Sequence, residues 1–393
     1  MRQFALALLL VAAGALHSAS RLVPGLLSAQ NGAQGQAVAV QAIAAPTRPL
    51  PPEEDSAGVA KFSFIAYGDT RGRQDGVELQ YEHGLVVRGM LAAIERLETT
   101  EYPVRFVLQS GDAVVDGGDA RQWNTSFVGL INRLTTDGGV AYFLAPGNHD
   151  VSAAENLDSS QRLQGLRNYL QAMSQLIPPD RAQRRLAGYP TYAFGYGNTF
   201  VVALDSNIAN DMTQYNWVKA QLEGLDRKRY VHIVALFHHP VISSGPHGGP
   251  KLEPPSAAMR ARYMPLFRAH HVNAVFAGHD HLFEHWVERY TDDTGRHRMD
   301  LVTSAGGGAP LYTYQSEPDL TDYLRANQAA TVRVEHLVKP GPEPSDNPYH
   351  FVIVHVNGER LDMEVVGVDW GSGFSPYPGR SNTVGLSDSA SLR

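Results

Sequence analysis

The chain of 393 residues contains no cysteine. Its fold therefore has no disulfide, and any metal ion that it binds is held without thiolates. Charged residues are also scarce, at 19% of the sequence, and acidic residues outnumber basic ones to give a net charge of −7. This balance argues against the broad basic surface that nucleic-acid binding requires. An anionic partner has to be attracted locally, by metal ions or a few arginines.

The apolar run near the N-terminus is too short to cross a membrane. It extends from Phe4 to Leu16 behind a charged start, Met1-Arg2, whereas a membrane span needs about 20 residues. This pattern is typical of a secretory signal peptide, which we place at residues 1–29. A retained membrane anchor is the alternative. We therefore expect an exported protein, periplasmic or secreted, with no stable membrane span.

Composition divides the rest of the chain into three parts. Residues 30–60 are rich in Ala, Gln and Pro without periodicity and are predicted to be a flexible linker. The last residues, 371–393, have a similar character and are predicted to be a disordered tail. Between them, residues 61–370 are expected to form one compact domain, since 43% of the chain is hydrophobic and can supply a sizeable core.

Within this domain, short apolar runs alternate with stretches of helical periodicity. Helices are predicted at residues 82–97, 123–134, 163–176, 214–225 and 259–270, and strands at 231–237 and 272–277. Two hairpins are predicted around Gly197-Asn198 and Asn357-Gly358, the second being a strong turn signal. Strands mixed with helices and hairpins indicate an α/β fold, a four-layer αββα sandwich of two mixed β-sheets flanked by helices.

Side chains able to bind metal follow the apolar runs. The polar blocks are Gly68-Asp69, Gly111-Asp112, Gly147-Asn148-His149-Asp150, His238-His239 and Gly278-His279-Asp280-His281. Strands of a layered α/β fold bring their carboxyl ends to one rim, so these distant blocks are expected to converge. Carboxylate, amide oxygen and imidazole together suit first-row divalent metals. The sequence therefore predicts a metal site assembled by the fold.

In their order and spacing, these blocks resemble the signature blocks of the calcineurin-like metallophosphoesterases, relatives of the purple acid phosphatases. Three weaker features also match: Leu204-Asp205-Ser206, a helix containing Trp217, and the glycine run Gly306 to Gly308. A lone Gly-Asp or His-x-His would carry little weight. Five blocks in the family's order, each at a predicted strand end, make the resemblance specific over residues 61–370.

The resemblance implies a centre with two divalent or mixed-valence metal ions, which would be Mn, Fe, Zn or Mg. Asp112 would bridge the two ions, because a carboxylate has two oxygens to share. Asp69 and His281 would complete the protein ligands of one ion. The ligands of the other would be Asn148, His238 and His279. A hydroxide held by the metals would attack phosphorus in line.

The resemblance also implies a proton donor. His149 would face the leaving oxygen and act as general acid, with Asp150 holding its orientation. In the pair His238-His239, the first histidine is expected to be the ligand and His239 to support it. Asp205 is expected to be structural, buried beneath the site.

Two positions depart from the family pattern. Arg71 stands where the first block, Asp-x-His, normally has a metal-binding histidine, and an arginine cation cannot bind a metal. Water or another residue, such as His83, would then complete that site. Arg71 itself would either clamp a phosphate oxygen or form an ion pair. Val115 replaces the tyrosine of purple acid phosphatases, so we expect no purple colour and weaker or more selective metal binding at Asp69.

The sequence thus predicts an exported, metal-dependent phosphoesterase that hydrolyses phosphate monoesters, with a small phosphorylated substrate. A phosphodiesterase or nucleotide hydrolase of the same fold is the alternative, followed by a noncatalytic metal-binding module. The substrate is expected to be chosen by loops at residues 151–187 and 243–257. The natural substrate and the oligomeric state stay open.

Overall fold

The computed structural model describes residues 38–152, 157–249, 252–368 and 373–386. The predicted signal peptide, residues 1–29, lies outside them. Among the described residues, no helix is long and apolar enough to cross a membrane.

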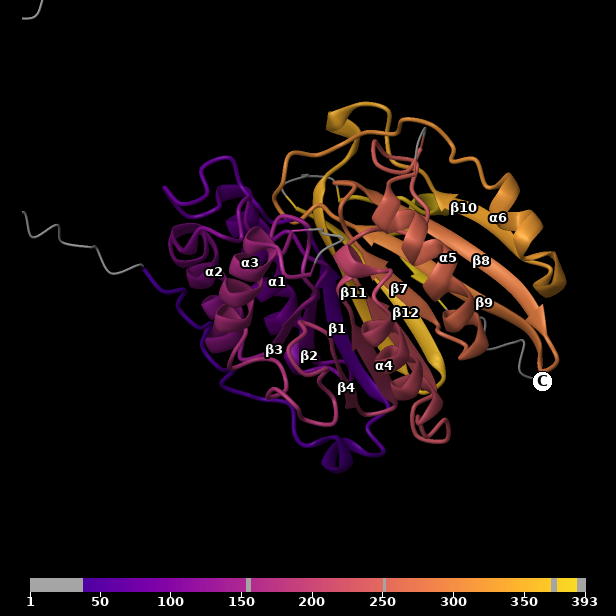
Figure 1. The fold of residues 1–393 in the computed structure, drawn as a ribbon, viewed down its shortest axis with the longest axis horizontal. Coiled ribbons are helices and arrows are strands. Elements are labelled where there is room, and N and C mark those ends of the chain that lie inside the picture. Colours follow the sequence, from indigo (N-terminus) through magenta and orange to yellow (C-terminus); the bar gives the residue numbers. More distant parts are fainter. Residues whose placement is uncertain (1–37, 153–156, 250–251, 369–372, 387–393) are drawn as a thin grey trace, which may run out of the picture. The chain divides into compact units, whose positions relative to one another are not determined.

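One sheet has six strands and joins distant parts of the chain. Its order is β13 (Thr383–Gly385), β12 (Arg360–Val368), β11 (Tyr349–Asn357), β1 (Lys61–Tyr67), β2 (Val104–Gln109) and β3 (Ala141–Leu144). Strands β1, β2 and β3 run parallel, whereas β11 pairs antiparallel with β1 and β12. Figure 1 shows the N-terminal β1 beside the C-terminal β11 and β12.

The second sheet has seven strands. Its order is β10 (Arg333–Val338), β8 (Phe283–Asp292), β9 (Gly295–Ser304), β7 (Ala274–Ala277), β6 (His232–Leu236), β5 (Thr199–Ala203) and β4 (Tyr192–Tyr196). Strands β5, β6, β7 and β9 run parallel, and β4 and β5 form the hairpin predicted around Gly197-Asn198. Both sheets are therefore mixed, as predicted.

The sheets face each other across an aromatic core. Phe143 and Phe194, from opposite sheets, stack with ring centroids 3.9 Å apart. Phe106 meets Phe194 edge to face at 5.3 Å, and Phe64 meets Phe276 in the same way at 6.0 Å. Alternation along each strand points these rings inward and buries the space between the sheets.

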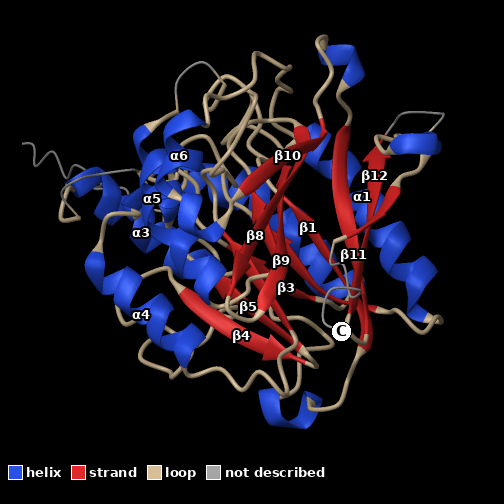
Figure 2. Ribbon diagram, turned by 90° about the vertical axis from the view of Figure 1, so that its right-hand side faces the viewer, coloured by secondary structure: helices blue, strands red, loops and turns tan. Residues whose placement is uncertain are grey.

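Helices cover the outer faces. They are α1 (Tyr81–Glu98), α2 (Val128–Asn132), α3 (Ser160–Ala172), α4 (Met212–Glu223), α5 (Pro254–Ala269) and α6 (Thr321–Ala326). Helix α1 lies on the six-stranded sheet, where Gly89 comes close to Phe351. Helices α4 and α5 bury their apolar faces on the seven-stranded sheet, and Figures 1 and 2 show them on the opposite side of the molecule from α1. The predicted four-layer αββα sandwich is confirmed.

The predicted flexible linker at residues 30–60 is wrong for its described part. Val40 and Ile43 are buried in the core, and the backbone N–H of Ile43 donates to Ala172 at 2.9 Å. Glu53–Ser56 form a 3₁₀ turn, and the Glu53 carboxylate accepts a hydrogen bond from Arg184 at 2.9 Å. Apolar residues without periodicity still pack when a folded surface receives them, which composition does not show.

The predicted disordered tail at residues 371–393 is wrong in the same way for residues 373–386. Strand β13 adds to the edge of the six-stranded sheet through β12. Tyr377 is buried against Phe283, and Leu386 is fully buried. An edge strand needs only exposed backbone partners, so three residues of ordinary composition suffice.

Two long strands were not predicted at all. β8 and β9 form a hairpin that carries charged residues at buried positions, among them Glu288 and Asp300. Glu288 pairs with Arg268 at 2.9 Å, and Asp300 pairs with His285 at 2.7 Å. Glu288 thus has a partner in α5 and Asp300 has one in the neighbouring strand β8. Because paired charges can be buried, they interrupt the apolar pattern by which a buried strand is recognised.

Candidate metal centre

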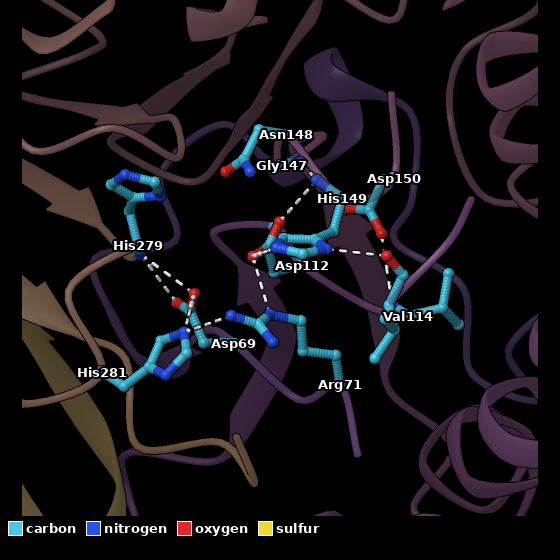
Figure 3. Close-up of polar contacts among 12 residues, drawn as sticks. Asp69, Arg71, Asp112, Val114, Gly147, Asn148, His149, Asp150, His279 and His281 are labelled. Carbon is cyan, nitrogen blue, oxygen red and sulfur yellow. Dashed lines mark hydrogen bonds and ion pairs between the residues drawn. The ribbon is translucent and has the colours of Figure 1, made fainter. Parts of the chain in front are cut away.

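The parallel strands of the two sheets end at one rim of the sandwich. Asp69 follows β1, Asp112 follows β2 and Asn148 follows β3 in the first sheet, while His238 follows β6 and His279 follows β7 in the second. Figure 3 shows the side chains from the two sheets facing one another. The structure thus brings the distant polar blocks together at one rim, as the sequence predicts.

Tight turns bring the backbone of these blocks together. Asp69, Asp112 and His279 have left-handed backbones with φ of 60°, 54° and 73°, which are rare for residues with a side chain. A Cβ on Gly147 would lie 2.1 Å from Oδ1 of Asp112, and one on Gly278 would lie 2.2 Å from Oδ2 of Asp69. Glycine is therefore required directly before Asn148 and His279. Backbone strain that the fold maintains is typical of a functional site.

Three ligand-type atoms lie around Nε2 of His238, which is the fourth. Its Nε2 lies 3.0 Å from Oδ1 of Asn148, 3.1 Å from Nδ1 of His279 and 3.4 Å from Oδ1 of Asp112. Two ligands bound about 2.1 Å from one ion, at angles between octahedral and tetrahedral, lie about 3.0–3.4 Å apart. These spacings are those of a metal coordination shell.

The hydrogen bonds behind the imidazoles decide which ring nitrogens carry lone pairs. Nδ1 of His238 donates to the backbone oxygen of Ser110 at 2.9 Å, so its Nε2 is the free base. Nε2 of His279 donates to Oε2 of Glu253 at 2.9 Å, so its Nδ1 is the free base. The amide oxygen of Asn148 and the carboxylate of Asp112 are acceptors too. Four lone pairs thus face each other with no hydrogen between them, and a cation is what relieves their repulsion.

The other predicted metal position has a different character. Nδ1 of His281 donates to the backbone oxygen of Pro310 at 2.8 Å, so its Nε2 faces Oδ1 of Asp69 at 3.5 Å. A positively charged group already lies there: Arg71 places Nη2 3.2 Å from Nε2 of His281 and Nε 3.2 Å from Oδ2 of Asp112. Figure 3 shows the guanidinium of Arg71 between these two side chains.

The pKa values of the two buried carboxylates, Asp112 and Asp69, are shifted in opposite directions. Burial raises the pKa of Asp112, but the nearby rings of His238 and His149 and the guanidinium of Arg71 outweigh it and bring that pKa below its ordinary value. Burial, followed by the charge of Asp112, raises the pKa of Asp69. Burial also lowers the pKa of His238 to about 3, so this ring is a neutral base at physiological pH. Asp112 and His238 are thus in the forms that bind cations, whereas the shift at Asp69 favours its neutral form.

His149 points into the centre, but Asp150 does not orient it. Nδ1 of His149 donates to the backbone oxygen of Val115 at 2.7 Å, which leaves Nε2 4.0 Å from Oδ2 of Asp112. The carboxylate of Asp150 instead accepts backbone N–H groups of Ala113 at 2.8 Å and Gly147 at 2.9 Å. The predicted contact between Asp150 and His149 is wrong, because the turn directs this carboxylate at unpaired backbone donors.

His83 does not lie at the centre. Both of its ring nitrogens have partners inside the core, Oε1 of Gln80 at 2.9 Å and the Tyr67 hydroxyl at 3.1 Å. Burial lowers its pKa to about 3. His83 therefore does not replace the missing histidine at position 71.

Other predicted residues take supporting positions. His239 packs its ring 4.4 Å from that of His279 and hydrogen-bonds Ser206 at 2.8 Å. Asp205 is fully buried, where it accepts a hydrogen bond from Arg162 at 2.6 Å. The backbone of Val115 holds His149, while its side chain is partly exposed.

Two residues of the centre were missed by the sequence reasoning. Glu253 links His279 to His247, whose Nδ1 donates to Oε1 of Glu253 at 2.6 Å. This hydrogen bond raises the pKa of His247, whose partly exposed ring lies beside the metal ligands. The signal was a histidine and a glutamate in the loop at residues 243–257, which sequence reasoning identified only as a substrate loop.

The family comparison agrees with this geometry. The sequence model of the calcineurin-like phosphoesterases matches residues 68–283, more than half of the chain, and the chain belongs to this family. The family depends on a dinuclear metal centre. The family match spans the metal-binding blocks from Gly68-Asp69 to Gly278-His279-Asp280-His281.

Purple acid phosphatases are among the similar proteins. Purple acid phosphatase 18 of Arabidopsis thaliana is 34% identical over 98 residues, which cover 24% of this chain and 21% of that protein. The solved structure of purple acid phosphatase PPD1 from yellow lupin seeds shares the fold with a TM-score of 0.58 and 17% identity, over 83% of this chain and 53% of the lupin chain. This chain thus spans about a fifth of the first relative and about half of the second.

Proposed function

We propose that this chain is an exported metal-dependent phosphoesterase that hydrolyses phosphate monoesters. The observation that carries the proposal is the convergence of acceptor atoms at His238, His279, Asn148 and Asp112, since such a group of lone pairs requires a cation. When bound there, metal ions supply positive charge that attracts phosphate and makes a nearby water more acidic. Membership in the phosphoesterase family supports the same reaction class.

The side chains of the protein supply orientation and a proton. The carboxylate of Asp112 accepts the backbone N–H of His149 at 3.0 Å, which fixes that turn beside the centre. Because Nδ1 of His149 is held by Val115, Nε2 is the atom that can give a proton to a leaving oxygen. The side chain of His149 is 31% exposed, so a substrate can reach it.

Monoesters are favoured by the positive charge around the centre. The guanidinium of Arg71 lies beside Asp112 and His281, and a terminal phosphate carries more negative charge than a diester. The predicted two-point clamp by Arg71 is limited, however, since Nε and Nη2 already bind Asp112 and His281. Hydrolysis of diesters or nucleotides stays the alternative within the same fold.

A direct test compares two substrates. The purified protein is given 4-nitrophenyl phosphate or bis(4-nitrophenyl) phosphate, with Mn²⁺, Zn²⁺, Mg²⁺ or Fe²⁺ added in turn. Faster release of nitrophenol from the monoester supports the proposal. Faster release from the diester supports the alternative. No turnover with any metal, in protein that binds metal, leaves the noncatalytic metal-binding module.

Export is a separate part of the proposal. It is supported by the charged start and apolar run at residues 1–29. Expression of the full chain in a Gram-negative host, followed by fractionation and N-terminal sequencing, tests it. We expect the protein outside the cytoplasm with a new N-terminus near residue 30; cytoplasmic protein beginning at Met1 contradicts it.

A further inference from the structure

Around the candidate metal centre, the atoms at the two metal positions have different hydrogen-bond partners. At the position formed by His238, His279 and Asn148, acceptor atoms face one another without any donor between them. At the position formed by Asp69 and His281, N–H groups already meet the acceptors. This difference does not follow from the family pattern and comes from residues of this chain.

Each acceptor at the second of these positions has a donor within reach. Nη2 of Arg71 lies 3.2 Å from the free base of His281, and Nε of Arg71 lies 3.2 Å from Oδ2 of Asp112. Both oxygens of Asp69 accept the backbone N–H of His279, at 3.0 Å each. The free ring nitrogen of His281 and one side of each carboxylate therefore already have a donor where a second ion would bind.

We propose that Arg71 is a resident cation that takes the place of the second metal ion, so that this chain binds one ion tightly, at Asn148, His238, His279 and Asp112. The inference rests on the proposed metal-dependent function and concerns how many ions serve it. The guanidinium supplies one positive charge permanently, since it does not lose its proton in proteins. A divalent ion between Asp69 and His281 would have to displace it from two buried partners.

The surroundings hold Arg71 in this place. Its side chain is 18% exposed, whereas that of Asp112 is 1% exposed, so their ion pair is largely shielded from water. The backbone N–H of Arg71 also donates to the backbone oxygen of Asp112 at 3.1 Å, which fixes the turn from which the side chain extends.

An aromatic ring closes the other side. Tyr312 stacks on His281, with ring centroids 4.2 Å apart and planes 14° from parallel. The backbone N–H of Tyr312 donates to the backbone oxygen of His281 at 2.8 Å. His281 is thus held facing Arg71, and it has little freedom to turn toward an ion elsewhere.

The test counts ions rather than turnover. The full chain is loaded with excess Mn²⁺, separated from free metal by gel filtration and analysed by inductively coupled plasma mass spectrometry and by electron paramagnetic resonance. We expect one ion per chain with the hyperfine pattern of an isolated Mn²⁺. In Arg71→His, which removes the cation and restores a ligand, we expect two ions per chain and a spin-coupled spectrum. Arg73→His, at an exposed neighbouring arginine, is the matched control and should bind one.

Several results overturn the inference. Two tightly bound ions in the unchanged chain would show that Arg71 does not exclude the second ion. The folding of Arg71→His is checked by circular dichroism. One ion in the folded variant would show that Asp69 and His281 do not bind a second ion even when Arg71 is absent. If Arg71→His does not fold, Arg71→Ala and the count in the unchanged chain decide.

The outcome for the proposed function is read separately. Hydrolysis of 4-nitrophenyl phosphate by a chain carrying two ions rejects only this inference. One bound ion without hydrolysis of any ester rejects the phosphoesterase and leaves the count intact. No bound ion rejects both.

Discussion

Glu253 and His279 form a carboxylate–imidazole pair directly behind the candidate metal centre, with Oε2 2.9 Å from Nε2. The pair points the other ring nitrogen of His279 at His238, with Nδ1 3.1 Å from Nε2 of His238. A carboxylate in this relation to a metal-binding histidine fixes the ring and its tautomer. Glu253 therefore belongs to the centre, although it lies in a loop far from every strand-end block.

Glu253→Gln should weaken metal binding while leaving the fold intact. A neutral amide holds the ring of His279 less firmly than a carboxylate does, so we expect a metal affinity roughly 10–100-fold lower. Competition with a metallochromic dye measures it. Glu54→Gln, at an exposed glutamate, is the control and should not change affinity. Unchanged affinity in Glu253→Gln would mean that the pair does not tune the ligand.

Removing metal should destabilise the folded chain. Metal binds the folded state, because the unfolded chain does not bring His238, Asn148 and Asp112 together. Saturation at a hundred to a thousand times Kd adds roughly 3–4 kcal/mol to the free energy of unfolding. Calorimetry with Zn²⁺ and then with EDTA should show Tm falling by several degrees. In His238→Ala this difference should vanish; an equal shift there would place the ion elsewhere.

His149→Ala should slow hydrolysis most for poor leaving groups. If Nε2 of His149 delivers the proton, its loss lowers kcat by roughly 10²–10⁴-fold for an alkyl phosphate. Nitrophenolate leaves without a proton, so 4-nitrophenyl phosphate should lose much less. Steady-state kinetics on both esters measure the contrast, with His270→Ala as a control away from the centre. Equal losses on both esters would argue for a binding role instead.

Glu284→Gln should change how stability depends on pH. Burial and the nearby Asp280 raise the pKa of Glu284 to about 7, while Ser244 donates to its carboxylate at 2.8 Å. The other polar neighbours are Ser243 and His336, the latter 3.6 Å away. A raised carboxyl pKa gives stability that is fully present below the ordinary value of 4.5 and is lost as pH rises through about 7.

The unchanged chain should therefore lose free energy of unfolding between pH 5 and 7, by up to ~1 kcal/mol per pH unit from this group. Glu284→Gln should lose less over the same window, and Glu359→Gln, at an exposed position, should behave as the unchanged chain. Urea unfolding at a series of pH values measures the slopes. Parallel slopes in all three proteins would count against a protonated Glu284.

Phe194→Ala should cost much of the stability of the sandwich. Phe194 stacks on Phe143 and meets Phe106, so its removal leaves a cavity between the two sheets. We expect the free energy of unfolding to fall by roughly 3–5 kcal/mol in urea denaturation. Val38→Ala, at a residue 62% exposed, is the control and should change little. A loss below about 1 kcal/mol would mean that the neighbouring rings close the gap.

Most of the fold was predictable because local signals agree with the tertiary structure. Alternation and turn residues gave the hairpin at Asn357-Gly358, and helical spacing gave α1 within about one residue at each end. The β8–β9 hairpin escaped prediction because buried charges such as Glu288 have partners that are distant in sequence. The segment at residues 38–60 escaped because packing of isolated apolar residues depends on the surface that receives them.

Some features of the candidate site could likewise be predicted from the sequence, and others could not. The sequence by itself determined the metal-binding residue types and their places after apolar runs, since parallel strands must end at one rim. Only the tertiary structure decided the direction of each side chain: Asp150 turns to backbone N–H groups, Glu253 comes in from a loop, and Arg71 lies between Asp112 and His281. The reason is physical. The pattern of apolar residues fixes where a strand ends. Hydrogen bonds and buried charges between distant segments fix where a side chain points.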